Sequence, residues 1–342
     1  MNATQPSKMP PVVQLLRLIM GKMPTQLIYV AAKLGIADLL TSGPKSIDEL
    51  AESTNTDSTS LYRVLRALVN MNIFAQNENN QFILTPLAEP LKSDAPDTVR
   101  DYAIMCGSDW HNQAWSNLSY SVETGKPAFD GRFNMKIFDF LEQNPEDSAI
   151  YHAGISSIDK LHTKLLSMAY DFSDLKTIMD VGGGYGALLA DILTANPLLK
   201  GILYEQPEVA AEVREIIQKG KFLDRFQIIE GDFFQKVPGG ADAYILKLII
   251  HNWNDDICRK ILENCRKNME KNNKLLVIEA IVPKGNKEHI AKLLDIEMLI
   301  FTDGGYERTE EEFRALFTSA GFHLNRIIPT LSHLSIIEAQ PS

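Results

Sequence analysis

From about Thr177 onward, short apolar runs alternate with segments of helical periodicity. Parallel strands need long crossover connections that are usually helical, so this alternation predicts an α/β fold with a doubly wound parallel sheet and helices on both faces. Two more strand-like runs, GFHLNRIIP and HLSIIEAQ, follow further along. The five runs that we expect to form the parallel strands are TIMDVGG, GILYE, FQIIE, AYILKLII and KLLVIEAIV.

Residues 11–110 have helical periodicity over most of their length and predict a separate module. Ser46 and Glu49 have the spacing of a capping box, and a second helix is expected from about Asp57. The runs NIFAQ and QFILT, separated by NENN, then predict a hairpin. Helix, turn, helix and hairpin in this order indicate a winged helix-turn-helix.

A winged helix raises the alternative of a DNA-binding regulator, and its charge argues against that function. Residues 25–90 contain four basic and seven acidic side chains, and the wing tip NENN has no cation. The whole chain has 34 Lys and Arg against 44 Asp and Glu, a net charge of -10. Because binding to phosphates requires local positive charge, we expect the module to serve packing or dimerisation, with no nucleic-acid or membrane partner.

A glycine-rich turn follows the first predicted strand, in the segment DVGGGYG. Gly182, Gly184 and Ala187 fit the looser form of a dinucleotide fingerprint, so their spacing alone does not exclude NAD. Asp180 and Gly186 extend the motif to D-x-G-x-G-x-G, the pattern of S-adenosylmethionine (SAM) binding in class I methyltransferases. The extended motif therefore favours SAM.

Acidic and aromatic residues end the next two predicted strands. Glu205 lies 25 residues after Asp180 and is suited to accept hydrogen bonds from ribose hydroxyls. Asp232 and Phe233 follow the third strand, where a carboxylate and a ring could bind adenine. We expect these residues at one edge of the sheet, around a nucleoside.

The segment HNWNDD follows the apolar run AYILKLII and places His251 at the same expected edge. Two distant glutamates, Glu279 and Glu307, are candidates to bind one ring nitrogen of this histidine. A carboxylate in that position fixes the tautomer and stabilises the protonated ring, so His251 is predicted to be a general base.

These motifs, together with LKLIIHNWNDD, VIEAIVP and GGYERTEEEF, make the chain resemble the small-molecule O-methyltransferases typified by caffeate, flavonoid, acetylserotonin and bacterial polyketide-tailoring enzymes. The resemblance implies a Rossmann-like class I methyltransferase domain at residues 171–342, a winged-helix dimerisation domain at residues 1–105, and a helical linker at residues 106–170 that contributes to the substrate pocket. It implies a homodimer. It also implies SAM contacts at Asp180, Gly182, Gly184, Glu205, Asp232, Phe233 and Lys247, and catalysis by His251 flanked by Glu279 and Glu307.

Three positions depart from that family's pattern. Glu205 stands where an aspartate is usual, Asn252 replaces an acid common after the histidine, and YHAGIS replaces a segment that usually holds a methionine. We therefore expect a pocket unlike that of the plant enzymes. The candidates for substrate contact are Met105, Trp110, Trp115, Phe138, His152, Asn252 and Met298.

The expected reaction is transfer of a methyl group from SAM to a phenolic or enolic hydroxyl of a small aromatic secondary metabolite. N-methylation or non-methylating chemistry on the same scaffold remains the alternative. No metal is expected, because Asp109 and His111 lack further ligands at suitable spacing. Three cysteines without CxxC spacing, and an apolar stretch at residues 12–20 too short for a membrane span, indicate a cytoplasmic protein.

Overall fold

The computed structural model describes residues 9–217 and 224–342, and the chain folds into two compact units. The first unit comprises Met1–Gln113 and Leu141–Ile158, and the second comprises Ala114–Phe140 and Asp159–Ser342. The two units share the helical segment that was expected at residues 106–170. The predicted domain boundaries at residues 105 and 170 therefore remain a prediction.

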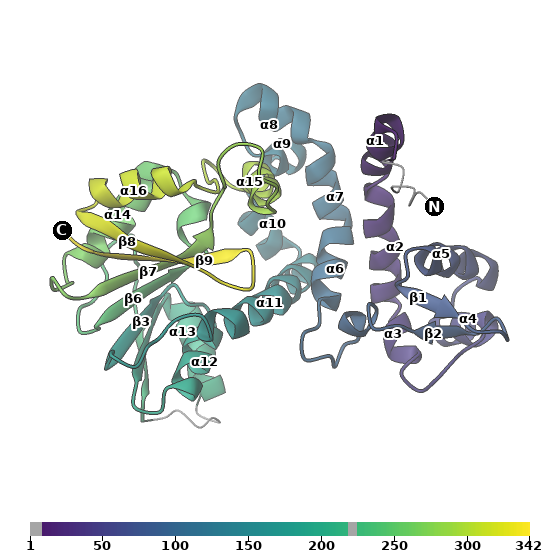
Figure 1. The fold of residues 1–342 in the computed structure, drawn as a ribbon, viewed down its shortest axis with the longest axis horizontal. Helices are drawn as coiled ribbons and strands as arrows, with labels where there is room; N and C mark the ends of the chain where they lie inside the picture. Colours follow the sequence, from purple (N-terminus) through teal and green to yellow (C-terminus); the bar gives the residue numbers. More distant parts are fainter. Residues whose placement is uncertain (1–8, 218–223) are drawn as a thin grey trace, which may run out of the picture. The chain divides into compact units, whose positions relative to one another are not determined.

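The first unit is mainly helical and contains a two-stranded antiparallel hairpin (Figure 1). The predicted capping box is confirmed: the backbone N–H of Glu49 donates to Ser46 Oγ at 3.3 Å, and the backbone N–H of Ser46 donates to Glu49 Oε2 at 2.7 Å. Asp57 caps the second helix, as predicted. The elements that begin in this unit are α1 (Pro11–Ile19), α2 (Lys22–Lys33), α3 (Ile36–Leu39), α4 (Ile47–Thr54), α5 (Ser58–Asn70), β1 (Phe74–Gln76), β2 (Phe82–Leu84), η1 (Glu89–Leu91), α6 (Arg100–Gly107), α7 (Asp109–Ser116) and α11 (Pro145–Ser167).

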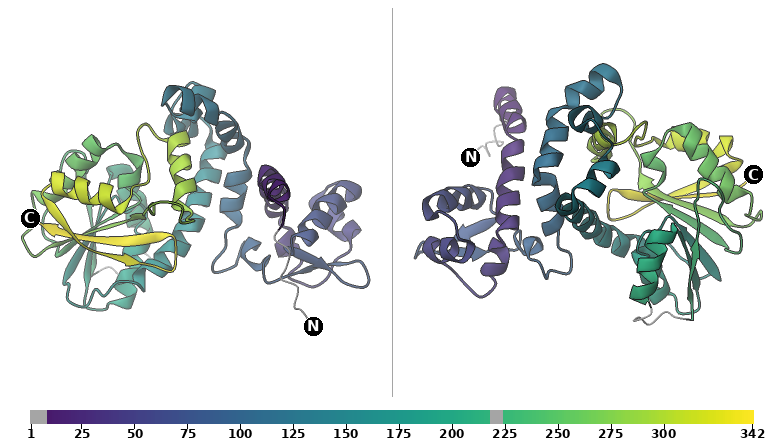
Figure 2. Two further views of the ribbon diagram at one scale, coloured as in Figure 1. Left: turned by 45° about the horizontal axis from the view of Figure 1, so that its top comes forward. Right: turned by 180° about the vertical axis from the view of Figure 1, so that it is seen from behind.

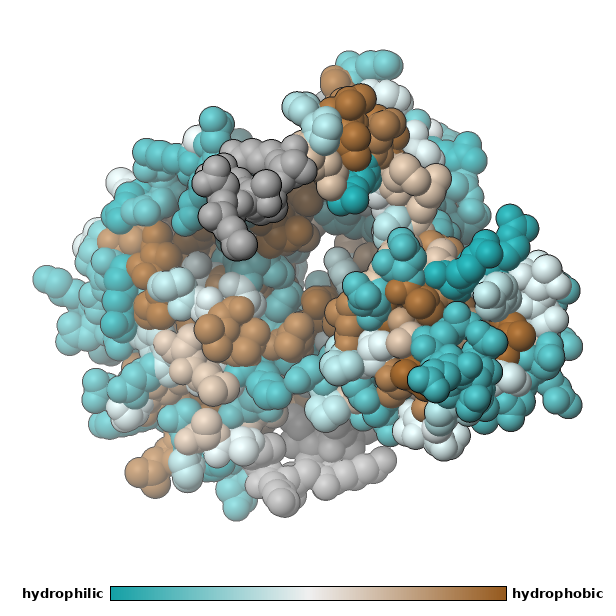
Figure 3. Space-filling model, turned by 45° about the vertical axis from the view of Figure 1, so that its right-hand side comes forward, coloured by the Kyte–Doolittle hydropathy of each residue, from teal (hydrophilic) through white to brown (hydrophobic). Residues whose placement is uncertain are grey.

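Helix α1 differs from the rest of this unit because its apolar side chains are exposed. Leu50, Leu65 and Phe82 are fully buried in the core that α2 to α5 and the hairpin share. In α1, by contrast, no residue is buried, and Leu18 and Ile19 are 77% and 68% exposed. Figure 3 shows hydrophobic residues exposed at several places among hydrophilic ones. Among the described residues, none of the helices combines the length and apolar character that a membrane span requires.

The second unit is built on a seven-stranded sheet with the order β5-β4-β3-β6-β7-β9-β8 (Figures 1 and 2). The five predicted strands pair in parallel, and of the two further strands β9 pairs antiparallel with both β7 and β8. The strands are β3 (Thr177–Val181), β4 (Lys200–Glu205), β5 (Phe226–Glu230), β6 (Ala243–Lys247), β7 (Lys274–Ala280), β8 (Phe322–Pro329) and β9 (Leu334–Pro341). The helical elements that begin in this unit are α8 (Leu118–Thr124), α9 (Ala128–Phe133), α10 (Ile137–Gln143), α12 (Ala187–Ala195), α13 (Pro207–Ile217), η2 (Ile250–Asn252), α14 (Asp255–Arg266), α15 (Ala291–Phe301) and α16 (Glu310–Ser319). Helices α7, α10 and α11 extend across the division between the units.

Both faces of this sheet are covered, as the continuously apolar strands predict. Successive residues of a strand point to opposite faces, so Met179 belongs to the core formed with α14 and α16, whereas Ile178 belongs to the core formed with α12 and the end of α11. The predicted doubly wound sheet is therefore confirmed.

The fourth strand of the sheet is shorter than the apolar run suggested. β6 ends at Lys247, and Leu248 has a φ of 54°, in the left-handed region that a branched side chain rarely adopts. The chain then forms the short 3-10 helix η2, followed by α14 with Asn254 as its N-cap. His251 therefore lies in a turn beyond the strand, and its position depends on what binds that turn.

Candidate active site

A glycine-rich turn connects β3 to α12. Gly182, Gly184 and Gly186 have φ values of 70°, 56° and 74°, a region that glycine occupies without strain. A Cβ atom on Gly182 would lie 2.9 Å from Cδ1 of Ile249 and 3.1 Å from Cε1 of Phe233. A Cβ atom on Gly184 would meet no other part of the described chain within 4 Å. The backbone of Gly184 therefore borders open space that a ligand could enter.

Glu205, the predicted ribose acid, lies beside this turn. Its Oε2 accepts a hydrogen bond from the backbone N–H of Gly184 at 2.9 Å, and its Oε1 accepts one from the backbone N–H of Gln206 at 2.8 Å. The carboxylate ends β4, which pairs directly with β3. The structure thus brings together the glycine turn and the acid, although Gly184 and Glu205 are 21 residues apart in the sequence.

Asp180 is a buried acid at the end of β3, and its Oδ1 has no hydrogen-bond partner among the described residues. Burial raises its pKa to about 7, although the ammonium group of Lys247 acts to lower it. An unpartnered buried carboxyl is costly, so this position favours a ligand that donates a hydrogen bond.

Lys247 ends β6, the other neighbour of β3. Its ammonium group forms an ion pair with Asp159 and donates a hydrogen bond to Thr163 Oγ1 at 3.2 Å, both on the part of α11 that belongs to this unit. The sequence did not indicate Asp159, because no motif or spacing relates α11 to the end of β6. Lys247 is therefore oriented by α11 within the structure.

Asp232 and Phe233 follow β5. The Oδ1 atom of Asp232 accepts a hydrogen bond from the backbone N–H of Phe234 at 2.8 Å, which fixes this carboxylate in a turn. The rings of Phe233 and Phe234 have centroids 4.5 Å apart, and the Phe233 ring also borders Gly182. The predicted adenine residues therefore lie at the same edge of the sheet as the glycine turn.

His251 lies between two buried glutamates. Its Nδ1 is 2.9 Å from Oε1 of Glu307 and 3.7 Å from Oε2 of Glu279. Glu279 also binds the backbone: its Oε1 accepts hydrogen bonds from the N–H groups of Ile250 at 2.8 Å and His251 at 3.2 Å. Because an ionised carboxylate only accepts hydrogen bonds, this geometry favours a proton on Nδ1 and a lone pair on Nε2.

The two glutamates also alter the protonation of the histidine. Burial acts to lower the pKa of His251, but Glu279 and Glu307 outweigh it, so the pKa is raised overall. Burial raises the pKa of Glu279 to about 7, with His251 opposing the shift. Protonation of His251 and protonation of Glu279 therefore influence each other.

A histidine nitrogen and carboxylate oxygens of the same three residues lie within 4.8 Å of one another, and these are ligand types that can also bind a metal ion. The expectation that the protein works without a metal therefore remains a prediction.

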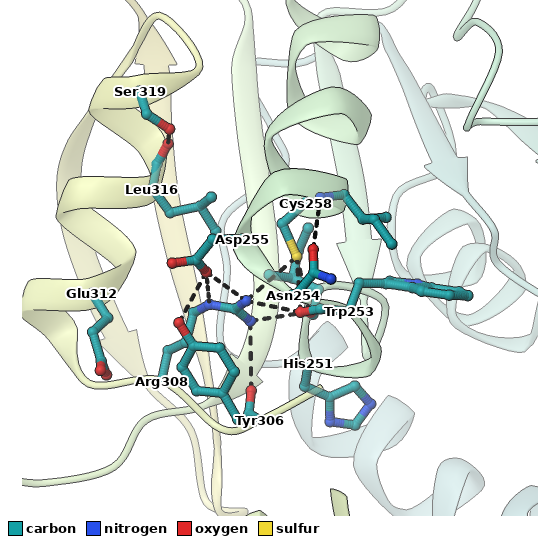
Figure 4. A network of polar contacts seen from close by, with 12 residues as sticks. His251, Trp253, Asn254, Asp255, Cys258, Tyr306, Arg308, Glu312, Leu316 and Ser319 are labelled. Carbon is teal, nitrogen blue, oxygen red and sulfur yellow. Dashed lines mark hydrogen bonds and ion pairs between the residues drawn. The ribbon is translucent and has the colours of Figure 1, made fainter. Parts of the chain in front are cut away.

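Arg308 is the second residue that the sequence did not single out. It lies within the quoted motif GGYERTEEEF, but nothing in the spacing relates it to HNWNDD. Its guanidinium group is fully buried and donates hydrogen bonds around the turn that contains His251 (Figure 4). The cysteines Cys258 and Cys265 lie in the neighbouring core, and neither forms a disulfide with another described residue.

Three substrate candidates fall in the first unit. Met105 is buried and contacts Gly154, where an added Cβ would lie 2.7 Å from the Met105 Cβ. Trp110 is buried with its ring centroid 6.3 Å from that of Tyr151, whereas His152 is exposed and lies 5.3 Å from the same tyrosine ring. Trp110, Tyr151 and His152 form an aromatic group on α7 and α11, and Met105 lies on α6.

The other four candidates fall in the second unit. Trp115 Nε1 donates to Oε2 of Glu297 at 2.8 Å, next to Met298 on α15. Phe138 is 67% exposed. Asn252 Nδ2 donates to the carbonyl of Leu248 at 3.0 Å, so this amide closes the turn after β6. Roles of all seven in substrate binding remain predictions.

The sheet order reverses at β3, between β4 and β6, and the glycine turn with its neighbouring acids lies at this switch point. That arrangement defines a doubly wound nucleotide-binding domain. The sequence profile of the O-methyltransferase domain matches residues 115–323, and that of the O-methyltransferase dimerisation domain matches residues 16–94.

Known proteins match over nearly the full length. A phenazine O-methyltransferase, PhzM, from Lysobacter antibioticus is 42% identical, and the match covers 96% of this chain and 95% of that protein. The 8-amino-8-demethylriboflavin N,N-dimethyltransferase of Streptomyces davaonensis is 30% identical, covering 92% and 90%. The SAH-bound crystal structure of CalO1, a methyltransferase in calicheamicin biosynthesis, is 33% identical with a TM-score of 0.87, covering 98% and 100%. The chain therefore belongs to the SAM-dependent O-methyltransferase family, and the predicted family, fold class and enzyme class are confirmed.

Proposed function

We propose that this enzyme transfers the methyl group of SAM to a phenolic or enolic hydroxyl of a small aromatic metabolite, with His251 as the general base. One observation carries the proposal: the His251 ring is bound at Nδ1 by the buried Glu307, which leaves Nε2 to accept a proton. The turn that bears it follows β6, at the edge that bears the glycine turn.

The residues at this edge suit SAM, which supplies an electrophilic methyl group on a positively charged sulfur. Gly184 allows close approach of the cofactor, Gly182 forms the same turn against Phe233, and Glu205 would accept hydrogen bonds from the ribose hydroxyls. Asp232 and Phe233 would bind adenine. Asp180 and Lys247 lie on the neighbouring strands β3 and β6 and would also contact the cofactor, Asp180 by accepting a hydrogen bond at its unpartnered Oδ1.

The chain's own contribution to catalysis is to position the acceptor and remove its proton. Holding two reactants in line is worth about 7–11 kcal/mol in the best intramolecular cases, and a general base adds about 10² to 10⁴ in rate. The proton passes from the acceptor hydroxyl to Nε2 of His251, and the resulting imidazolium is stabilised by Glu307 and Glu279. The raised pKa of His251 makes it a stronger base for a phenol.

The test uses His251→Ala and His251→Gln, with His323→Ala, an exposed histidine on β8, as the control. A panel of hydroxylated phenazines, phenols and enols is incubated with methyl-labelled SAM, and SAM affinity is measured by calorimetry. We expect turnover to fall by about 10² or more while SAM still binds. Turnover near that of the wild type in either His251 variant would refute the role of this base.

N-methylation is the second candidate, because a relative that is 30% identical is an N,N-dimethyltransferase. An aromatic amine needs no deprotonation before attack, so its methylation would depend less on His251. Aminophenazines and aminophenols in the same panel, with the methylated atom located by mass spectrometry, separate the two reactions. Label found only on nitrogen would replace the first proposal by the second.

We also propose that the first unit forms a homodimer. The dimerisation-domain profile covers residues 16–94, and the apolar side chains of α1 are exposed in the single chain. Burial of this helix against a second copy would remove it from water.

A further inference from the structure

Arg308 combines full burial with hydrogen bonds to the backbone on both sides of His251. Its side chain is 0% exposed. Nη1 donates to the carbonyl of Ile250 at 3.0 Å, and Nη2 donates to the carbonyl of Trp253 at 2.9 Å. Figure 4 shows the His251 ring directed away from the guanidinium group, so Arg308 binds the main chain of the turn and not its ring.

The turn at residues 250–253 is short and leaves its backbone groups to be satisfied by side chains. Glu279 accepts hydrogen bonds from the N–H groups of Ile250 and His251, at the N-terminal end of η2. Arg308 donates to the carbonyl of Ile250, the first residue of η2, and to that of Trp253, which caps its C-terminal end. The carboxylate of Glu279 at the N–H groups and the guanidinium of Arg308 at the carbonyls match the polarity of a helical turn. Each takes the place of the water molecules that would bind these backbone groups if the turn were exposed.

Arg308 is itself held in a single orientation. Nε and Nη2 donate to Oδ1 of Asp255 at 3.0 and 2.8 Å, and the same oxygen accepts a hydrogen bond from the hydroxyl of Tyr306 at 2.9 Å. The guanidinium group lies 4.1 Å from the centroid of the Tyr306 ring. A planar guanidinium group that stacks on an aromatic ring and is also bound to a carboxylate has little freedom to move.

The residue before Arg308 in the chain is Glu307, which binds the His251 ring. The backbone carbonyl of Arg308 accepts a hydrogen bond from Val282 N–H at 2.9 Å, in a bridge beside the end of β7, the strand that carries Glu279. One short segment therefore contacts the ring of His251 through Glu307 and its backbone through Arg308.

On this geometry we propose that Arg308 is a positioning residue that fixes the 250–253 turn and so directs Nε2 of His251 toward the acceptor. The inference deepens the proposed function and rests on it for its kinetic consequences. Its structural part, that Arg308 sets the orientation of the His251 ring, stands independently of which group accepts the proton.

The experiment compares Arg308→Lys and Arg308→Gln with matched changes at Arg266. Arg266 also donates to backbone carbonyls, those of Gly321, Met269 and Ser342, but it lies at the end of α14. Lysine retains the charge and loses the planar fork, so Arg308→Lys separates position from charge. We expect its kcat to fall by about 10² with KM and SAM affinity changed by less than about threefold, and Arg266→Lys to retain the wild-type kcat.

Two readouts distinguish positioning from a general loss of structure. In the His251→Ala background, Arg308→Lys should lower kcat by less than about twofold, because a residue that acts through His251 has nothing left to position. In the otherwise wild-type protein, the ring ¹H–¹³C NMR signal of His251, assigned by its loss in His251→Ala, should shift or split in Arg308→Lys and remain unchanged in Arg266→Lys.

The inference would be overturned if Arg308→Lys lowered kcat equally with and without His251. It would also be overturned if folded Arg308→Lys kept the wild-type kcat or left the ring signal of His251 unaltered. If His251→Ala itself retains wild-type turnover, the proposed base is wrong, and the ring signal alone then decides whether Arg308 positions this turn.

Discussion

Replacement of Glu307 by glutamine removes one charge from the catalytic group and retains its shape. The affected contact is the 2.9 Å pair between Nδ1 of His251 and Oε1 of Glu307, whose side chain is 2% exposed. A buried hydrogen bond to a charged group is worth about 1.5–3 kcal/mol, which corresponds to about one to two pKa units for the imidazolium. We therefore expect the pKa of His251 to fall in Glu307→Gln and kcat to decrease about 10- to 100-fold.

The sign of the pH effect follows from the role of the base. His251 acts in its neutral form, so its pKa sets the acid limb of kcat/KM, and the carboxylate of Glu307 raises that pKa. In Glu307→Gln the acid limb should move to lower pH by about one unit or more. The assay is initial-rate methylation of a phenolic acceptor across the pH range.

The matched control is Glu311→Gln, because Glu311 is exposed and pairs only with Lys284 among the ion pairs that the structure describes. It should leave both kcat and the acid limb unchanged. An acid limb that stays in place, or moves to higher pH, in Glu307→Gln would refute the assignment of Glu307 to the protonation of His251.

Three further predictions follow from the fold and the cofactor edge. Asp180→Asn should raise the Tm of the ligand-free protein above about pH 7 and have little effect below about pH 4. In the folded protein the pKa of Asp180 is raised from 3.8 to about 7, so the stability that the protonated carboxyl contributes is fully present below pH 3.8 and is lost as the pH rises. The loss in free energy of unfolding is at most about 4 kcal/mol, and calorimetry across the pH range measures it. Prolonged treatment with EDTA should leave turnover unchanged, and a loss restored by one divalent cation would show that the His251 group binds a metal instead. Leu18→Lys combined with Ile19→Lys should convert the dimer to a monomer at micromolar concentration by light scattering, and a dimer that survives both charges would place the interface elsewhere.

The strand ends were predictable because they follow from local rules. In a parallel sheet all carboxyl ends share one edge, so the acids and glycines that close successive apolar runs had to come together. Glu205 and the Gly184 N–H illustrate this: register alone brings them within hydrogen-bond distance. The capping box at the start of α4 was predictable for the same reason, because it depends on two residues three positions apart, Ser46 and Glu49.

The end of β6 was not predictable from hydrophobicity. The apolar run continues to Ile250, but the parallel pairing with β7 ends at Lys247, and Leu248 turns the chain with a positive φ. Ile250 is fully buried all the same, so its apolar character reports burial and not strand structure. Periodicity cannot distinguish a buried strand residue from a buried residue in a turn.

Arg308 and Asp159 escaped prediction because their partners lie far away in the sequence. Arg308 binds backbone carbonyl groups, and every residue type carries such a group, so the sequence does not indicate which residues accept these hydrogen bonds. Asp159 pairs with a lysine 88 residues later, through a helix whose packing no local pattern specifies. Sequence patterns indicate side chains that follow successive strands, and they miss side chains whose partner is the backbone or that reach the sheet from a separately packed helix.

The charged groups around His251 would destabilise the fold if they bound only one another, because burying a carboxylate costs several kcal/mol that a single ion pair rarely offsets. Here much of the charge is directed at the backbone of one turn: Glu279 accepts from two N–H groups, and Arg308 donates to two carbonyls. The ring itself contacts Glu307 closely and Glu279 at 3.7 Å. The same buried charges that adjust the pKa of the histidine therefore also determine where its backbone lies, so a substitution in this group is expected to change the protonation and the position of His251 together.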